Sequence, residues 1–275
     1  MRPHGLLGLV RIHREPRKVD WAVSKYDSLF SLEGKVVVVT GASAGIGRDL
    51  AIGLAEAGAE LVICSRRKQE LEEVRTEIEN CGRRAEVFVL DVRDVASIEC
   101  LKKFITQQFG RVDVLVNNAS FSVRKPSWDV TAEDWDNVLD VGLKGLFFCC
   151  QIIGSIMRDQ NYGKIINMSS TYSRTVTNGK SVYAAMKAGV SHLTEALAVE
   201  WAPVGIRVNA LAPTAVATPT RNLQGEVLKN VLRRIPLGRF ATTEDLIGAA
   251  IYLASPASDF VTGQTLFVDG GWTAG

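Results

Sequence analysis

Short hydrophobic runs alternate with amphipathic segments from about residue 35 to the end of the chain. The unbroken run Val36–Val39 is typical of a strand that is buried on both faces of a parallel sheet. In the segment that follows, Ile46, Leu50 and Leu54 recur at helical spacing, and Gly58 ends that helix. Later runs of the same kind predict the remaining strands at Glu60–Cys64, Val87–Leu90, Val112–Val116, Lys164–Met168, Arg207–Leu211 and Thr265–Val268.

The amphipathic segments predict helices between these strands. Thr131-Ala-Glu-Asp134 resembles a capping box that opens a long helix running toward Met157. The other helices are expected around Leu71–Ile78, over Ala96–Phe109, over Ser181–Ala202 and after Thr242. This alternation predicts the α/β class, with a doubly wound parallel sheet of about seven strands flanked by helices.

We expect one catalytic domain over residues 32–275 and an N-terminal extension over residues 1–31. Residues 1–30 carry six basic side chains against three acidic ones, so a solvated extension and an organellar targeting segment both remain open. Residues 214–237 interrupt the rhythm with a long connection that contains proline and threonine, which suits an active-site lid.

The composition restricts the binding partners that can be expected and adds little to the fold prediction. A formal net charge of +2 over 275 residues gives no overall argument for nucleic-acid binding. The longest uncharged apolar stretch, Gly145–Met157, is shorter than the roughly 18 residues of a membrane span, so no membrane partner is expected. Three histidines and five cysteines without a Cys-x-x-Cys pair predict no metal site and no disulfide framework, and they indicate a reducing, cytoplasmic setting.

A glycine-rich turn, Gly41-Ala-Ser43-Ala-Gly45-Ile46-Gly47, follows the first predicted strand. Gly41 allows a tight turn, while Gly45 and Gly47 let backbone amides and a helix N-terminus approach a pyrophosphate. Its position between a strand and a helix predicts dinucleotide binding.

A second group of residues indicates proton transfer. Tyr183 and Lys187 lie four apart in a predicted helix and share one face. An unperturbed tyrosine has a pKa near ~10, and a cation one turn away favours the phenolate. Ser170, at the end of a predicted strand, can hydrogen-bond a substrate oxygen that gains negative charge.

The glycine spacing, together with Tyr183-Ala-Ala-Met-Lys187, resembles the short-chain dehydrogenase/reductase family from about Leu32 to the C-terminus. Further matches are Asp91-Val92, Asn117-Asn118-Ala119, Ser170, Pro213–Thr218 and Val268-Asp269-Gly270-Gly271. The C-terminal half is similar to the gluconate 5-dehydrogenase and 3-oxoacyl-carrier-protein reductase branch. The resemblance implies a single-domain Rossmann fold. The resemblance implies that Tyr183 donates and accepts the proton, that Ser170 binds the substrate oxygen, and that Lys187 tunes the tyrosine and holds the nicotinamide ribose.

The resemblance also implies a cofactor site and a substrate pocket. The cofactor residues are expected to be Gly41, Ser43, Gly45, Ile46, Gly47, Ser65, Arg66, Asp91, Val92, Asn118, Ala119, Tyr183, Lys187, Pro213 and Thr218. The substrate residues are expected to be Ser120, Phe121, Ser170, Tyr172, Tyr183 and Thr214. Asp91 is expected at the adenine amino group and Thr218 at the nicotinamide carboxamide. A homodimer or homotetramer is expected, through the two long helices after Thr131 and Ser181.

The end of the second predicted strand favours one cofactor. Rossmann proteins that prefer NAD place a carboxylate there, roughly 20 residues past the glycines. This chain has Ser65-Arg66-Arg67-Lys68 instead, and a basic run suits the 2′-phosphate of NADP(H), with Arg66 pairing with it or stacking on adenine. We therefore expect NADP(H), and with it carbonyl reduction of a small or medium polar substrate.

Three positions depart from the family pattern. Ser120 replaces a glycine, Thr214 replaces the glycine that usually follows the proline at 213, and Gly142 stands where the family has an asparagine. That asparagine anchors a water between the catalytic lysine and solvent, and a glycine within a helix also destabilises by roughly 0.5–1 kcal/mol relative to alanine.

Three hypotheses follow. The first is an NADP(H)-dependent oxidoreductase that interconverts a secondary alcohol and a ketone. The second is an NAD-dependent polyol or sugar-acid dehydrogenase, against which Arg66 argues. The third is a weakly active or non-catalytic NADP-binding protein, which Gly142 favours.

Overall fold

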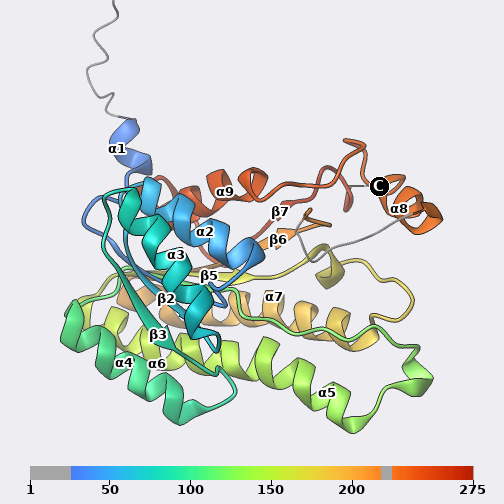
Figure 1. The fold of residues 1–275 in the computed structure, drawn as a ribbon, viewed down its shortest axis with the longest axis horizontal. Helices are drawn as coiled ribbons and strands as arrows, with labels where there is room; N and C mark the ends of the chain where they lie inside the picture. Colours follow the sequence, from blue (N-terminus) through green and yellow to red (C-terminus); the bar gives the residue numbers. More distant parts are fainter. Residues whose placement is uncertain (1–25, 218–224, 275) are drawn as a thin grey trace, which may run out of the picture.

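A single parallel sheet forms the centre of the molecule (Figure 1). The computed structural model describes residues 26–217 and 225–274, and in this part of the chain seven strands follow the order β3-β2-β1-β4-β5-β6-β7. The strands are β1 (Val36–Thr40), β2 (Glu60–Ser65), β3 (Ala85–Val89), β4 (Val114–Asn117), β5 (Gly163–Met168), β6 (Ile206–Pro213) and β7 (Thr265–Val268). The predicted seven-stranded Rossmann-type sheet is confirmed.

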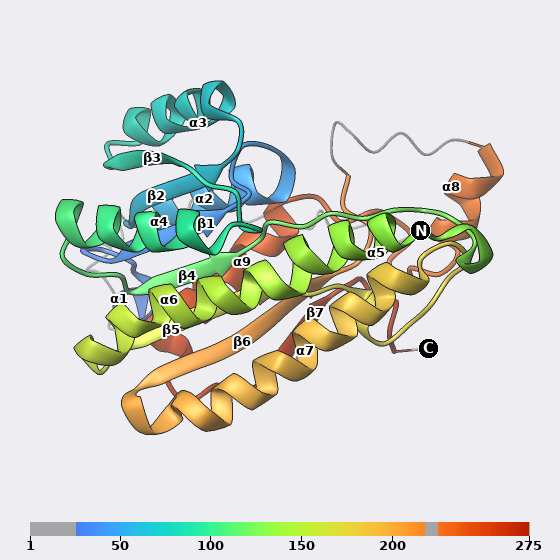
Figure 2. The ribbon, with the colours of Figure 1, turned by 90° about the horizontal axis from the view of Figure 1, so that it is seen from below.

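Helices cover both faces of the sheet. One face carries α2 (Gly45–Glu56), α3 (Lys68–Asn80) and α9 (Glu244–Ala254), and the other carries α4 (Val95–Gln108), α6 (Gly145–Gln160) and α7 (Ser181–Trp201). Figure 2 shows the second layer from below. The shorter elements are α1 (Asp27–Phe30), α5 (Ala132–Leu139), α8 (Gly225–Leu232), the 3-10 turns η1 (Ser127–Asp129), η3 (Thr171–Ser173), η4 (Ala202–Val204) and η5 (Pro256–Ser258), and the π-helical turn η2 (Asp140–Lys144).

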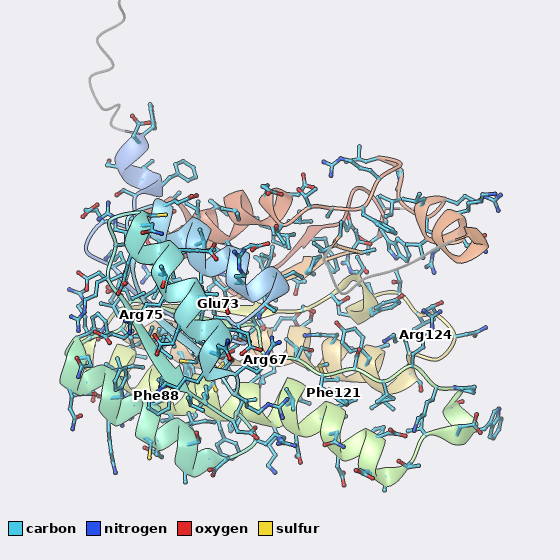
Figure 3. The ribbon with its side chains drawn as sticks, in the orientation of Figure 1. Arg67, Glu73, Arg75, Phe88, Phe121 and Arg124 are labelled. Atoms are coloured by element: carbon cyan, nitrogen blue, oxygen red, sulfur yellow. The ribbon has the colours of Figure 1, made fainter. Side chains whose placement is uncertain are left out.

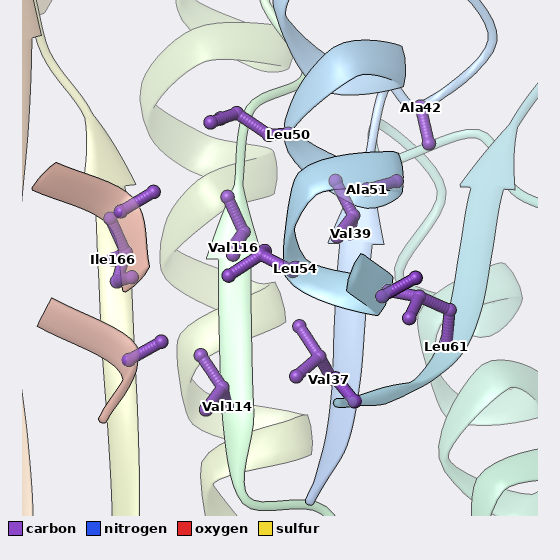
Figure 4. Packing of buried hydrophobic residues seen from close by; sticks show 14 of the residues in the cluster. Val37, Val39, Ala42, Leu50, Ala51, Leu54, Leu61, Val114, Val116 and Ile166 are labelled. Atoms are coloured by element: carbon purple, nitrogen blue, oxygen red, sulfur yellow. The ribbon is translucent and has the colours of Figure 1, made fainter. Parts of the chain in front are cut away.

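Alternate residues of each central strand pack into different halves of the core. Val37 and Val39 of β1 lie with Leu50 and Leu54 of α2 in one buried cluster (Figure 4). Val38 lies in the second cluster, with the buried faces of α4, α6 and α7. Both faces of β1 must therefore be apolar, which is why its sequence is a continuous run of valines.

The order of the strands places a crevice at one edge of the sheet. β1 pairs with β2 on one side and with β4 on the other, and all pairs are parallel. After β1 the chain continues to β2 on one side, whereas after β4 it continues to β5 on the other side, so the connections diverge between β1 and β4. Ligands of such sheets bind outside the carboxyl ends of the strands at this switch point.

The predicted capping box opens the long helix. Asp134 N donates to Thr131 Oγ1 at 3.1 Å, and Thr131 N donates to the Asp134 carboxylate at 3.0 Å. The helix continues through α5, η2 and α6, but the π-helical turn at η2 was not predicted. Directly after it, a Cβ on Gly145 would lie 2.5 Å from the carbonyl oxygen of Val92, so glycine lets this helix approach the loop after β3.

The combined helix Ala132–Gln160 is long and apolar enough to cross a membrane by length and composition, with a mean hydropathy of 1.5. Half of its apolar window is buried within the fold, and the helix packs against α4 and α7. It is a core helix, and its hydropathy reflects burial between other helices and the sheet.

Leu32 anchors the start of the predicted domain to the core. Its side chain is fully buried, and its N–H donates to the carbonyl of Ala57 at 2.9 Å. The extension predicted over residues 1–31 falls mostly on residues 1–25, which lie outside the described residues.

Candidate active site

The glycine-rich turn lies between β1 and α2, at the carboxyl edge of the sheet. Gly41 has a φ of +67°, and a Cβ there would lie 2.9 Å from the Cα of Ala119. A Cβ on Gly47 would collide with the side chain of Asn118. Both positions therefore require glycine. The first helical residue of α2 is Gly45, and no side chain caps its N-terminus, so its N–H groups are available to a pyrophosphate.

Hydrogen bonds join this turn to the loop after β4. The side-chain amide of Asn118 donates to the carbonyls of Thr40 and Gly41, both at 3.1 Å. Thr40 Oγ1 accepts from the N–H groups of Asn118 and Ala119, also at 3.1 Å. The two loops that carry predicted cofactor residues thus form one continuous wall.

Basic residues gather at the end of β2. Arg66 is exposed and lines the cleft, as does Arg67, which the sequence analysis did not assign to the site. Arg67 donates from Nε and Nη2 to Ser43 Oγ at 3.2 and 2.8 Å, and its own N–H donates to Ser65 Oγ at 3.0 Å. Figure 3 shows Arg67 near the start of α3. Its place in the basic run was the signal that could have identified it.

Asp91 follows β3 and forms an ion pair inside the cleft. Its carboxylate accepts from Arg93 Nη2 at 2.6 Å and from Arg93 Nε at 3.1 Å, and the Arg93 hydrogen bonds lower the pKa of this carboxyl. The neighbouring Val92 is 8% exposed and also lines the cleft. Arg93 is a second cation that the sequence analysis missed, and it brings a guanidinium beside the position expected for adenine.

The tyrosine–lysine pair projects from α7 into the same cleft. Lys187 is 3% exposed, and its Nζ donates to the carbonyl of Met168, at the end of β5, at 2.5 Å. The same Nζ lies 5.7 Å from the ring centroid of Tyr183. Burial lowers the pKa of Lys187 to about 8, so its charged form is already weakened near neutral pH. An ammonium at this distance favours the tyrosine phenolate.

Ser170 lies just beyond β5 and is 7% exposed. Its Oγ accepts from the N–H of Tyr172 at 3.2 Å, so Ser170 caps the N-terminus of the following 3-10 turn and its hydroxyl oxygen is held in place. The Tyr172 ring packs edge-on against the ring of Tyr183, with centroids 6.0 Å apart. The predicted serine and tyrosine therefore face a shared space.

All these groups line one cleft of about 1080 Å³. Every predicted site residue that the structure describes is part of its lining, while their individual roles stay predictions. Thr218 lies outside the described residues, as does part of the predicted lid over 214–237. Val231 of α8 and Trp272 near the C-terminus close the far end of the cleft.

The cleft is strongly cationic. Among the described residues that line it, Asp91 is the only acid. The basic residues in the lining are Arg66, Arg67, Arg93, Arg124, Lys180 and Lys187. Arg124 lies in the loop after β4 and Lys180 lies immediately before α7, and Figure 3 shows Arg124 well apart from Arg67. Sequence analysis did not find these two, because the loop and the helix start that carry them meet only in the folded chain.

Gly142 lies in the π-helical turn η2, not in a regular helix as the sequence suggested. It is buried, and a Cβ there would lie 2.6 Å from both Sδ and Cε of Met186 on α7. Met186 is fully buried. The thioether therefore occupies the space that a side chain at 142 would need.

Comparisons with known proteins agree with this geometry. The profile of the family described as enoyl-(acyl carrier protein) reductase matches residues 41–273. The chain is 39% identical over 251 residues to the 2-dehydro-3-deoxy-D-gluconate 5-dehydrogenase of Escherichia coli K12, covering 90% of this chain and 98% of that protein. It is also 39% identical over 241 residues to a 3-oxoacyl-(acyl-carrier-protein) reductase of Thermotoga maritima, covering 87% and 98% of the two chains.

Solved structures show the same fold. The gluconate 5-dehydrogenase of Burkholderia cenocepacia, in complex with NADP and tartrate, superposes with a TM-score of 0.87 at 37% identity, covering 91% of this chain and 99% of that one. An NAD(P)-dependent gluconate 5-dehydrogenase of Beutenbergia cavernae, so described and with NADP bound, gives a TM-score of 0.86 at 40% identity, with coverage of 90% and 100%. With this match over nearly all of the described fold, the chain belongs to the short-chain dehydrogenase/reductase family.

Proposed function

We propose that this oxidoreductase interconverts a secondary alcohol and a ketone by hydride transfer with NADP(H), and that it acts as a carbonyl reductase. The observation that carries the proposal is the convergence of Ser170, Tyr183 and Lys187 on the cleft whose other end is the glycine-rich turn. A tyrosine–lysine pair on a solvated helix surface would leave the lysine exposed. Lys187 is instead 3% exposed, and its ammonium lies against the end of the central strand β5.

The residues at the end of β2 favour NADP(H) over NAD. The Arg67 guanidinium is held against Ser43 in the glycine-rich turn, and Arg66 is free to turn toward the same place. A guanidinium binds a phosphate through two parallel hydrogen bonds, and this strand end offers no carboxylate to grip two ribose hydroxyls. NADP in the Burkholderia and Beutenbergia proteins supports this choice. The NAD-dependent glycerol dehydrogenase of Listeria innocua, 34% identical over 250 residues, supports the alternative, an NAD-dependent dehydrogenase.

The chain's own groups can handle the proton. When bound, the nicotinamide supplies the hydride that adds to the carbonyl carbon. The Tyr183 hydroxyl then donates its proton to the carbonyl oxygen, which gives the alcohol. The Lys187 ammonium stabilises the phenolate that remains, and Ser170 donates a hydrogen bond to the oxygen while it carries negative charge.

The charge of the cleft favours an anionic substrate. At the substrate end, Arg124 and Lys180 line the cleft together with Phe121 and Tyr172, and no acidic residue among the described lining lies there. A polar ketone with a carboxylate, such as a keto acid derived from a sugar, fits these groups. The gluconate dehydrogenases among the relatives, and tartrate in the Burkholderia complex, support this class.

The fit of Met186 over Gly142 favours an active enzyme over a non-catalytic binding protein. Because the methionine fills the volume next to the glycine, the missing asparagine leaves no gap beside α7. The catalytic helix therefore keeps its place, and Lys187 keeps its contact with Met168.

An apolar groove supports the expected homodimer or homotetramer. The groove lies between α5–η2–α6 and α7 and has a volume of about 500 Å³. It is lined by Leu139, Leu143, Lys144, Phe147, Gly189, His192, Leu193 and Ala196. Two copies could bury these faces against each other, as exposed apolar patches often mark contact surfaces.

All five cysteines are free, which fits the cytoplasmic setting inferred from the sequence.

Turnover is the direct test of the proposed activity. With NADPH and a panel of ketones, aldehydes and keto acids, we expect consumption of NADPH, fastest with a carboxylate-bearing polar ketone. Tyr183→Phe should lower kcat by about 10²–10⁴-fold, because the proton donor is lost, while NADPH still binds. NADPH binding without turnover on any member of the panel would instead favour the non-catalytic hypothesis.

Arg66→Asp tests the cofactor. The affinity for NADPH should fall by about 10–100-fold, since a hydrogen bond to a charged group contributes about 1.5–3 kcal/mol, while NADH binding should change little. Dissociation constants from fluorescence titration measure both. Lys68→Asp makes the same charge change at a residue outside the cleft lining and should leave the preference intact. An equal loss for both nucleotides in Arg66→Asp would defeat the assignment.

Gly142→Asn tests the role of the replaced asparagine. Alone, it should destabilise the protein by about 1–3 kcal/mol, because its Cβ overlaps the Met186 thioether. Combined with Met186→Ser, the loss measured by thermal unfolding should be smaller than the sum of the two single losses. If the double variant has the kcat and pH profile of the wild type, the side chain at position 142 has no part in proton transfer.

Phe147→Glu tests the assembly. A charge in the groove should convert the expected dimer or tetramer into a monomer, as measured by light scattering after gel filtration. Val89→Glu, at a half-exposed apolar residue on the edge strand β3, serves as a control and should keep the wild-type mass. A wild-type monomer, or an unchanged mass in Phe147→Glu, would contradict this arrangement.

A further inference from the structure

Two lysine ammonium groups lie beside the ring of Tyr183. The Nζ of Lys187, four residues later on α7, lies 5.7 Å from the ring centroid. The Nζ of Lys180, the residue immediately before α7, lies closer, at 5.3 Å. Lys180 is also part of the cleft lining, so the tyrosine has a cation one turn away in each direction along the chain.

The Lys180 side chain is held in this position. Its Nζ donates to Ser122 Oγ at 3.2 Å and to the carbonyl of Val123 at 3.3 Å, both in the loop after β4. That loop is fixed in turn, since the N–H of Lys125 donates to the carbonyl of Gly179 at 3.2 Å. Lys180 is only partly exposed. The ammonium therefore keeps a defined position instead of sampling many side-chain conformers in solvent.

The surrounding charges leave the cations dominant near the tyrosine. In the elements packed against α7, Asp134 of α5 is paired with Lys125 at 2.6 Å, and Asp140 of η2 is paired with Lys144 at 3.2 Å. The remaining titratable groups in the described elements packed against α7 are Glu133 and Asp136 on the exposed side of α5, Tyr172 in η3, Lys164 in β5 and Arg207 in β6. Arg124, in the loop after β4, also lines the cleft.

Lys187 alone is a weak source of positive charge at alkaline pH. Burial lowers its pKa to about 8, so it loses its proton in the range where a tyrosine begins to form the phenolate. A second cation over the ring would stabilise the phenolate independently of Lys187. Both ammonium groups lie within about 6 Å of the ring centroid, and the Coulomb attraction to a phenolate is sizeable at such distances in the partly buried mouth of a cleft.

We propose that Lys180 is a positioning residue that stabilises the phenolate form of Tyr183 and so sets, together with Lys187, the pH range in which the tyrosine exchanges its proton. The inference rests on the proposed function for its catalytic meaning, but the effect of Lys180 on Tyr183 exists in the protein without substrate. The proposal adds Lys180 to the proton-transfer site, although Lys180 is not part of the Tyr183–Lys187 motif.

The pH dependence of alcohol oxidation with NADP⁺ tests this role in turnover. Because loss of a nearby cation disfavours the phenolate, Lys180→Gln should move the rising limb of the kcat profile to higher pH by about one unit. Lys180→Arg keeps the charge and should restore most of the shift. Lys125→Gln removes a neighbouring cation that is paired with Asp134, and it should leave the limb in place.

A titration without turnover separates this proposal from the proposed function. The ultraviolet absorbance of tyrosinate is measured against pH in the wild type and in Lys180→Gln, each with its Tyr183→Phe counterpart subtracted to isolate Tyr183 among the five tyrosines. We expect a midpoint about one pH unit higher without Lys180. Equal midpoints in the wild type and in Lys180→Gln would overturn the proposal. So would a midpoint in Lys180→Arg that is shifted as far as in Lys180→Gln. A rise in KM with an unchanged pH profile would also overturn it, and would make Lys180 a substrate anchor. Absence of wild-type turnover counts against the proposed function alone.

Discussion

The hydrogen bonds between the ends of β1 and β4 are the constraint on which the site depends. Asn118 donates two hydrogen bonds to Thr40, from its backbone N–H to the threonine hydroxyl and from its side-chain amide to the threonine carbonyl. This brings the glycine-rich turn against the loop after β4 so closely that neither Gly41 nor Gly47 has room for a Cβ. The cofactor end and the substrate end of the cleft therefore belong to one rigid unit, although about 70 residues separate them in the chain.

Buried polar groups extend this unit to α7. The side chain of Asn117 in β4 donates to Asn167 in β5 at 3.0 Å, and Asn167 donates to Thr194 of α7 at 3.0 Å. Two turns earlier on α7, Lys187 donates to the carbonyl at the end of β5. Buried polar contacts of this kind favour one arrangement, because breaking them would leave more buried groups without partners. Tyr183 and Ser170 thus keep their relative positions through β5.

The sequence was informative where one element decides the outcome. A valine run buried on two faces predicts β1, and the side chains of Thr131 and Asp134 predict the start of α5. It was silent where two distant segments meet. Arg67 approaches Ser43 only because β2 lies next to β1, and Lys180 meets the loop after β4 only in the packed molecule. The π-helical turn is of the same kind, since it depends on how the long helix packs, and local propensity does not encode it.

Gly142 illustrates the difference between a missing residue and a changed contact. In the sequence, Gly142 stands within a predicted helix at a position where the family has an asparagine. In the fold, it receives Met186 from α7, while Gly189 of α7 lies against the side chain of Leu143 from the neighbouring helix. Each helix thus offers a glycine to a large side chain of the other, and close packing is retained with a different pair of residues. The thioether of Met186 fills the space beside Gly142, while Lys187, the next residue on α7, lines the cleft.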